Sequence, residues 1–152
     1  MPSLFGTGTT WLFTYDLGGN IQSKVAYAER RFAIVLENDK EVQKWLRPAA
    51  KQFSIYYGPG SIARYEPDFI VETKTGIFMV ETKERNEMNS EVVQQKAIAG
   101  REYCRAVTEW CKETGGKPWT YALVAHDEVN LNSSFGYLVD PGRTVTQMSF
   151  DI

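Results

Sequence analysis

Apolar residues recur with helical spacing in two parts of the chain. The first predicted helix runs from about Ser23 to Glu37, and Glu29, in its middle, lies off the apolar face. That face is formed by Val25, Ala28, Phe32, Val35 and Leu36. A longer helix is expected over about Ser90 to Thr114. Its stripe contains small residues, which indicate close packing on a sheet: Val93, Ala97, Gly100, Cys104, Val107 and Cys111. Gly115 and Gly116 would end this helix.

Short runs of β-branched and aromatic residues predict the strands. One covers Trp11–Tyr15, one lies in "KQFSIYYG" (51–58), and a last one covers Trp119–Ala125. "EVQKWL" (41–46) is interpreted as one more helical turn. Two apolar runs within Tyr65–Arg85, separated by Thr73-Lys74-Thr75-Gly76, predict a β-hairpin.

The resulting order is strand, helix, three strands, helix, strand. It predicts an α/β fold with a mixed β-sheet and helices on both of its sides. At 152 residues the chain is expected to form one domain, with a core over about residues 11–125. The tail, residues 126–152, has no clear pattern and is not assigned to any element.

Composition narrows the class of protein. With 43% hydrophobic and 24% charged residues, the chain has the balance of a globular protein and not of a disordered one. No apolar run approaches the ~18 residues of a membrane span, and the first residues lack the pattern of a signal peptide, so a cytoplasmic location is expected. The net charge of −2 is unusual for a nucleic-acid binder. Contact with DNA would need a local basic patch, a metal ion or another protein.

The predicted hairpin carries charges inside its apolar runs. If the turn is centred on Lys74-Thr75, Asp68 faces Glu81, and Lys83 shares the face of Glu81 because side chains alternate along a strand. A bulge at Gly76 would shift this pairing by one residue, and the sequence leaves that alternative open. Pro67 is expected to bend the strand where Asp68 is presented.

Two opposed carboxylates destabilise a hairpin unless a cation lies between them. Oxygen-only ligands of this kind suit Mg²⁺, which can polarise a phosphoryl oxygen and lower the pKa of a water. Lys83 would then act beside the phosphate as an electrostatic partner or proton acceptor. The competing interpretation is that these charges are solvated ends of ordinary strands.

The order of several sequence blocks resembles the PD-(D/E)xK nuclease superfamily, and more closely the C-terminal endonuclease domain of type III restriction enzymes. The resemblance covers about Trp11 to Trp110, and its blocks are "AERRF", "VQKWL", "ARYEPDFIV", "FMVETK" and "KAIAGREYC". It implies a restriction-endonuclease-like fold and a Mg²⁺-dependent endodeoxyribonuclease, in which Mn²⁺ substitutes for Mg²⁺.

The resemblance also assigns roles to individual residues. Asp68 and Glu81 become metal ligands, the Thr82 backbone carbonyl completes the metal shell, and Lys83 becomes the catalytic lysine. Glu29 corresponds to the helical acid of the family, acting on the metal through water, and Lys96 to an accessory lysine of the second helix.

The same family implies partners and leaves alternatives. DNA is the expected substrate, with a helicase motor and a methyltransferase or specificity subunit as candidate partners. "GTGTT" (6–10) lacks the lysine of a phosphate-binding loop, so ATP use is not part of the expectation. The alternatives are a free-standing phage, plasmid or repair nuclease of the same fold, and a catalytically silent DNA-binding or docking module.

Other candidates are weighed against simple packing. The aromatics Trp45, Tyr56, Tyr57 and Tyr65 have the chemistry to stack on bases, although a core role is the more common one. His126, the single histidine, is assigned a loop or packing role. A phosphate-binding patch around the first helix is an alternative to a solvated surface for five basic residues: Arg30, Arg31, Lys44, Arg47 and Lys51.

Overall fold

The computed structural model describes residues 24–140, so the predicted strand Trp11–Tyr15 and the end of the tail lie outside the described residues. The helices are α2 (Lys24–Asn38), α3 (Glu91–Lys112) and the short α4 (Phe135–Leu138). The strands are β1 (Val42–Leu46), β2 (Ile55–Tyr57), β3 (Ala63–Tyr65), β4 (Phe69–Thr73), β5 (Ile77–Lys83) and β6 (Trp119–Ala125). Three short 3-10 turns are η1 (Pro59–Ser61), η2 (Arg85–Glu87) and η3 (His126–Glu128).

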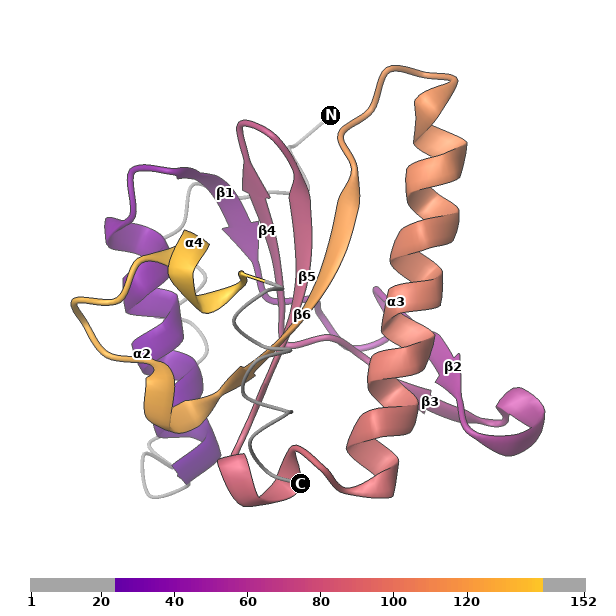
Figure 1. Cartoon of the computed structure of the whole chain (residues 1–152), viewed down its shortest axis with the longest axis horizontal. Coiled ribbons are helices and arrows are strands. Elements are labelled where there is room, and N and C mark those ends of the chain that lie inside the picture. The colour runs from indigo at the N-terminus through magenta and orange to yellow at the C-terminus, as the bar shows by residue number, and fades with distance from the viewer. Residues whose placement is uncertain (1–23, 141–152) are drawn as a thin grey trace.

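The larger sheet is mixed, as predicted, and its four strands have the order β1-β4-β5-β6. β1 and β5 each pair antiparallel with β4, whereas β6 pairs parallel with β5. The parallel pair requires a crossover, and α3 supplies it (Figure 1). β2 and β3 form a separate two-stranded antiparallel sheet that projects beside α3 (Figure 1).

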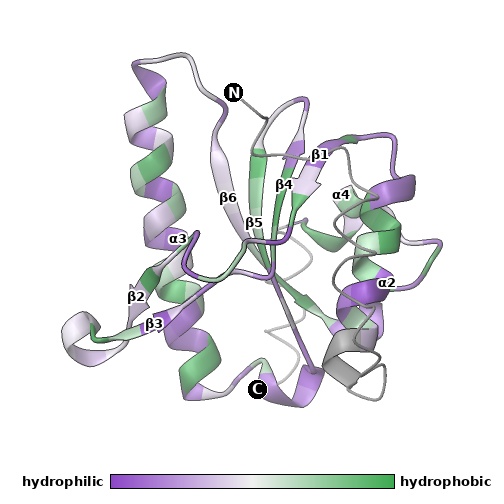
Figure 2. Ribbon diagram, turned by 180° about the vertical axis from the view of Figure 1, so that it is seen from behind, coloured by the Kyte–Doolittle hydropathy of each residue, from purple (hydrophilic) through white to green (hydrophobic). Residues whose placement is uncertain are grey.

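Helices cover both faces of the larger sheet. Residues of α2 and α4 pack with Phe69, Val71 and Val80 on one face. Residues of α3 and of the β2–β3 sheet pack with Ile70 and Met79 on the other. Figure 2 shows the middle of the sheet as apolar and α3 with both apolar and polar positions along its length. The chain is therefore α/β with a mixed sheet between helices, and among the described helices none combines the length and apolarity of a membrane span.

The segment "VQKWL" is β1, so its interpretation as a helical turn is wrong. A register shift between Val42 and Lys44 interrupts the ladder with β4 and breaks the alternation of side chains. Val42 and Trp45 consequently contact the same core cluster although they are three residues apart. This spacing is typical of a helix, which explains why the sequence pattern was misleading.

Five strands, and not three, lie between α2 and α3 among the described residues. The first arm of the predicted hairpin is also interrupted. Tyr65 ends β3, which pairs with β2, and β4 begins only at Phe69. Glu66, Pro67 and Asp68 connect two different sheets, and Pro67 occupies this break as the sequence predicted a bend there.

The long helix matches its prediction closely. The Ser90 hydroxyl caps its start by accepting a hydrogen bond from Val93 N–H at 3.3 Å. At its other end Gly115 adopts a φ of +73°, and the Gly116 N–H donates to the Cys111 carbonyl at 3.0 Å. The buried stripe contains Val93, Ala97, Gly100 and Cys104, which confirms the small residues as the contact with the sheet.

Gly100 allows the closest approach between α3 and the sheet. A Cβ atom at this position would lie 2.4 Å from Tyr121 Cδ2 and 2.7 Å from the Tyr65 hydroxyl. Gly100→Ala should therefore destabilise the protein by about 1–3 kcal/mol through overpacking, although alanine favours helices. Urea unfolding measures this change.

Gly136 is a matched control because it is also helical, but a Cβ atom added there would meet no other atom within 4 Å. Gly136→Ala should leave stability unchanged or raise it by up to about 1 kcal/mol. If Gly100→Ala is as stable as the parent protein, the close contact between α3 and Tyr121 is not a constraint on the fold.

Candidate active site

Of the two registers that the sequence left open for β4 and β5, the structure has the direct one. Phe69 pairs with Val80 and Ile70 with Met79, with no shift at Gly76, so Asp68 precedes the ladder at the position opposite Glu81. The Asp68 Oδ2 atom accepts hydrogen bonds from the Thr82 N–H at 2.8 Å and the Thr82 hydroxyl at 3.2 Å. These two bonds orient the Asp68 carboxylate at the end of the hairpin.

Glu81 is buried in the sheet and is 5% exposed. Its Oε2 atom has no hydrogen-bond partner among residues 24–140. Burial and then the Asp68 carboxylate raise the pKa of Glu81 to about 8, while Lys83 and Lys96 act in the opposite direction. The two acids thus repel each other in a site with little water around Glu81.

Asp68 shows the same effect to a smaller extent. Burial and the Glu29 carboxylate raise the pKa of Asp68 to about 6. The hydrogen bonds from Thr82 and the charge of Arg47 oppose this rise. Glu29, predicted as the helical acid, is therefore close enough to influence Asp68.

Glu29 is 7% exposed and so lies closer to the core than the sequence pattern indicated. Its Oε2 atom forms an ion pair with Arg47 Nη2 at 2.6 Å, and the Arg47 guanidinium lies 5.2 Å from the centre of the Phe69 ring. The Glu29–Arg47 ion pair links α2 to the segment that follows β1, and both charges act on Asp68. A water-mediated role of Glu29 toward a metal stays a prediction.

Two residues of the predicted basic patch contact other side chains. Arg47 pairs with Glu29, and the Arg31 guanidinium lies 5.5 Å from the centre of the Tyr27 ring. Arg30, Lys44 and Lys51 are exposed on three different segments. A shared phosphate-binding surface for these five residues stays a prediction.

Two lysines reach the acids from different elements. Lys83 lies two residues beyond Glu81 on β5 and pairs with Ala125 of β6, so it shares the Glu81 face of the sheet. Lys96 comes from α3, and its Nζ atom lies 5.5 Å and 5.7 Å from the centres of the Tyr57 and Tyr65 rings. Both lysines offset the negative charge at Glu81.

His126 lies at the site although the sequence assigned it a packing or loop role. It directly follows β6, and its buried Nε2 atom has no hydrogen-bond partner in the part of the chain that the structure describes. Burial lowers the pKa of His126, and the Glu84 carboxylate and the Thr82 backbone partly offset that effect. The pairing of Lys83 with Ala125 brings His126 here, and no local pattern around His126 indicates that pairing.

Tyr65 and Tyr121 were also missed as neighbours of the acids. Their buried hydroxyl groups have no hydrogen-bond partner among the described residues. Burial, followed by the charge of Glu81, raises the pKa of each phenol. Both tyrosines pack beside Gly100 of α3. They form the wall of the site between the sheet and α3.

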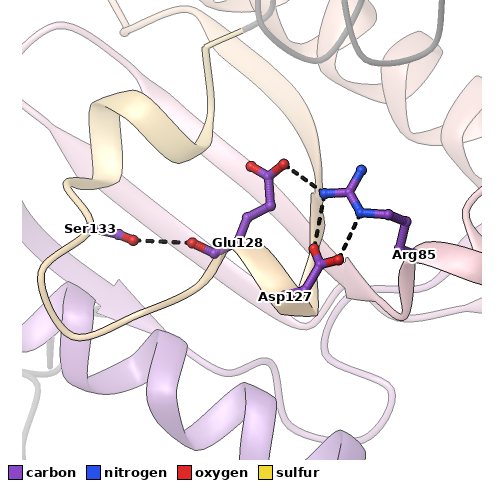
Figure 3. Close-up of polar contacts among 4 residues, drawn as sticks. All are labelled: Arg85, Asp127, Glu128 and Ser133. Atoms are coloured by element: carbon purple, nitrogen blue, oxygen red, sulfur yellow. Dashed lines mark hydrogen bonds and ion pairs between the residues drawn. The ribbon is translucent and has the colours of Figure 1, made fainter. Parts of the chain in front are cut away.

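A cluster of ion pairs joins the segments that follow β5 and β6 (Figure 3). Arg85, just after β5, binds Asp127 through Nε at 2.7 Å and Nη2 at 2.9 Å, and binds Glu128 through Nη2 at 2.7 Å. The Ser133 hydroxyl donates to the Glu128 carbonyl at 3.1 Å (Figure 3). These contacts connect η2 to η3, and η3 to the segment before α4.

The donors present fit a hard cation held by few protein ligands. Within residues 24–140 no group of three or more histidine, cysteine, aspartate or glutamate side chains is arranged to hold a metal ion. Asp68 and Glu81 nevertheless provide two adjacent carboxylates, and one Glu81 oxygen has no hydrogen-bond partner within the same residues. Mg²⁺ is commonly bound through one or two carboxylates while keeping several waters, so this pair suits Mg²⁺ better than a metal that needs a full protein cage.

The burial of Glu81 predicts a dependence of stability on pH. Because its pKa is raised in the folded state, the folded protein holds a proton that the unfolded chain releases, and stability falls as pH rises from about 4.5 to about 8. In chelator, Glu81→Gln should remove most of this fall, and the part that remains below about pH 6 comes from Asp68, whose pKa is raised to about 6. The variant should be more stable than the parent at pH 8 by about 2 kcal/mol or more, since one pKa unit corresponds to about 1.4 kcal/mol.

Urea unfolding of both proteins between pH 4 and pH 9 measures the difference. Glu72→Gln is the control, because Glu72 lies on β4 and pairs with Lys117 at 2.9 Å, so that change should not remove the fall. A parent protein with the same pH profile as Glu81→Gln would show that Glu81 is not destabilised by its surroundings.

No family model matches this sequence, and a search of curated proteins finds no match either.

Proposed function

We propose that this chain is a Mg²⁺-dependent endonuclease that hydrolyses phosphodiester bonds in DNA, with a fold like that of the PD-(D/E)xK nucleases. The observation that carries the proposal is the opposition of Asp68 and Glu81 at the end of the β4–β5 ladder, with Lys83 on the Glu81 face. Asp68 lies opposite the buried Glu81 and its charge raises the pKa of Glu81, an arrangement that costs stability. A site that binds a cation and a phosphodiester would explain this arrangement.

Asp68, Glu81 and the Thr82 backbone carbonyl would hold the Mg²⁺ ion. When bound, the ion would polarise the phosphodiester and lower the pKa of a water. Thr82 keeps Asp68 oriented through its N–H and hydroxyl group. The ion pair between Glu29 and Arg47 would determine the electrostatic environment of Asp68.

The lysines supply positive charge for the phosphate. The Lys83 ammonium would stabilise the negative charge that grows on the phosphate oxygens during attack. Lys96 approaches Glu81 from α3 and would help to attract the DNA backbone. Lys83 and Lys96 would thus provide part of the local positive charge that a protein with a net charge of −2 needs in order to bind DNA.

The resemblance to the endonuclease domain of type III restriction enzymes extends the proposal to partners. A helicase motor and a methyltransferase or specificity subunit would then deliver DNA to this chain and compensate for its low net charge. In that case the chain would cleave poorly by itself and more rapidly with such a motor.

Nicking of supercoiled plasmid tests the reaction. The purified chain should nick DNA with Mg²⁺ or Mn²⁺, lose that activity in chelator, and remain inactive with Ca²⁺, which activates water poorly. Lys83→Ala should lower the nicking rate about 100-fold or more, because one donor aimed at developing charge contributes about 10²–10³ in rate.

Lys74→Ala is the matched control, since Lys74 lies in the exposed turn at the opposite end of the same hairpin. It should nick DNA at the parent rate. Full activity of the parent in chelator, or equal rates for Lys83→Ala and the parent, would contradict the proposed site.

Mg²⁺ binding has its own consequence for stability. If the dissociation constant is near 1 mM, about 10 mM Mg²⁺ should stabilise the parent by roughly 1.4 kcal/mol. Glu81→Gln, which loses a ligand, should gain clearly less, whereas Glu72→Gln should gain as much as the parent. Thermal or urea unfolding with and without Mg²⁺ measures these gains, and equal gains for the parent and Glu81→Gln would place the metal elsewhere.

A further inference from the structure

A pocket of about 300 Å³ lies between the β2–β3 sheet and α3. Tyr56, Tyr57 and Pro59 form its wall on the side of β2 and η1, and Gln95, Ile98 and Glu102 form its wall on α3. This volume is at the lower end of the range for small-molecule sites, about 300–1,000 Å³. The pocket is thus large enough for one planar ring system and too small for a large ligand.

Two apolar side chains of the pocket face solvent. Tyr56 is 56% exposed and Ile98 is 54% exposed, whereas Tyr65, two residues after Ala63 on the neighbouring strand, is buried. Of the four aromatic residues that the sequence offered for base stacking, Trp45 and Tyr65 belong to the core, and Tyr57 is half-buried. Tyr56 is the member of that set whose ring is available to a ligand.

The turn between β2 and β3 lies close to α3, so this side of the pocket is already formed. A Cβ atom at Gly58 would lie 3.2 Å from the Gln95 side-chain oxygen, and Gly58 adopts a φ of +77° that favours glycine. The Ser61 N–H closes the tip by donating to the Gly58 carbonyl at 3.0 Å. The pocket therefore needs little rearrangement to receive a ligand.

The polar groups of the pocket are suited to amino groups on a flat ring. Gln95 Nε2 donates to Glu91 Oε1 at 3.2 Å, which directs the Gln95 amide and leaves its oxygen as an acceptor toward the hairpin. Glu102 adds a carboxylate, also an acceptor. Two acceptors beside an aromatic face match the exocyclic amino groups and π-faces of nucleobases.

Tyr57 and Lys96 link the pocket to the candidate active site. Tyr57 lines the pocket, and its ring also lies 5.5 Å from Lys96 Nζ. Lys96 contacts the ring of Tyr65 as well, and Asp68 follows Tyr65 by three residues. On the two-stranded sheet, Arg64 is exposed and pairs directly with Tyr56, which places a guanidinium beside the exposed ring. Lys96 and Arg64 thus offer phosphate contacts on either side of the pocket.

From this arrangement we propose that the pocket binds an unpaired nucleobase of a DNA strand, stacked on Tyr56, while the strand runs past Lys96 to Asp68 and Glu81. The inference rests on the proposed nuclease function for the identity of the strand. It adds that this function includes recognition of single-stranded DNA, at a flap, a gap or a melted segment next to the cleavage site.

Fluorescence anisotropy with a labelled single-stranded oligonucleotide in chelator tests the pocket without cleavage. Tyr56→Ala should weaken binding about fivefold to a hundredfold, the range for losing one base–aromatic stack, and Tyr56→Phe should bind like the parent. Tyr137→Ala is the matched control. Tyr137 is 55% exposed but belongs to α4, which packs on the other face of the sheet, so binding should not change.

A strand of the same length made of abasic sites separates base contacts from phosphate contacts. The parent and Tyr56→Ala should bind this strand equally and weakly. No binding of the normal strand by the parent, equal effects of Tyr56→Ala and Tyr137→Ala, or a Tyr56 effect that persists on the abasic strand would each overturn the base pocket.

These outcomes are independent of the nuclease test. Plasmid nicking that depends on Lys83 but not on Tyr56, with no binding of single strands, would overturn the pocket and leave the proposed function. Tyr56-dependent binding by a chain that never cleaves DNA would support the pocket and overturn the nuclease.

Discussion

β4 and β5 pair with Phe69 opposite Val80, and this register decides which side chains share each face of the central sheet. A shift by one residue would turn Glu81 toward α2 and Val80 toward α3, and both core clusters would lose their apolar residues. In the observed register Val80 packs against the α2 face and Met79 against the α3 face. The same pairing makes Asp68 and Glu81 neighbours, so the core and the candidate site depend on one set of backbone hydrogen bonds.

The electrostatics of the site follow from this geometry. Glu81 cannot leave the sheet without disturbing Met79 and Leu123, its neighbours on the α3 face. Asp68 cannot turn away without losing its two hydrogen bonds from Thr82. The positive groups around the acids come from three elements: Lys83 from β5, Lys96 from α3 and Arg47 from the segment after β1. They reduce the repulsion between the acids without forming a direct ion pair with Glu81 in the described part of the chain, which leaves Glu81 available to a cation.

The β2–β3 sheet gives the site a second wall. Only Glu66, Pro67 and Asp68 lie between this sheet and β4 in the chain. A ligand bound by the small sheet would therefore lie close to Asp68. Close packing of Gly100 of α3 with Tyr65 and Tyr121 keeps this sheet near the larger one. The pocket between the small sheet and α3 is linked to the two acids through Tyr57, Lys96 and Tyr65.

The sequence by itself determined the elements with strong local patterns and the chemistry of the hairpin. The long helix and the strand Trp119–Ala125 depend on side-chain period and a helix cap, which act over a few residues. For the hairpin the sequence allowed two registers, and the structure has the one in which Asp68 lies opposite Glu81. The α/β class with a mixed sheet followed from the order of those elements.

Only the tertiary structure decided which residues from distant segments surround the acids. The bulge in β1 produced a helix-like spacing in a strand, because the alternation of side chains depends on a partner strand that the local sequence does not specify. Arg47, His126 and Tyr121 reach the site through an ion pair, a parallel strand pairing and a helix packed at a glycine. Each of these contacts joins residues far apart in the chain. A local pattern of hydrophobic and polar positions cannot predict such contacts, because it depends only on neighbouring residues.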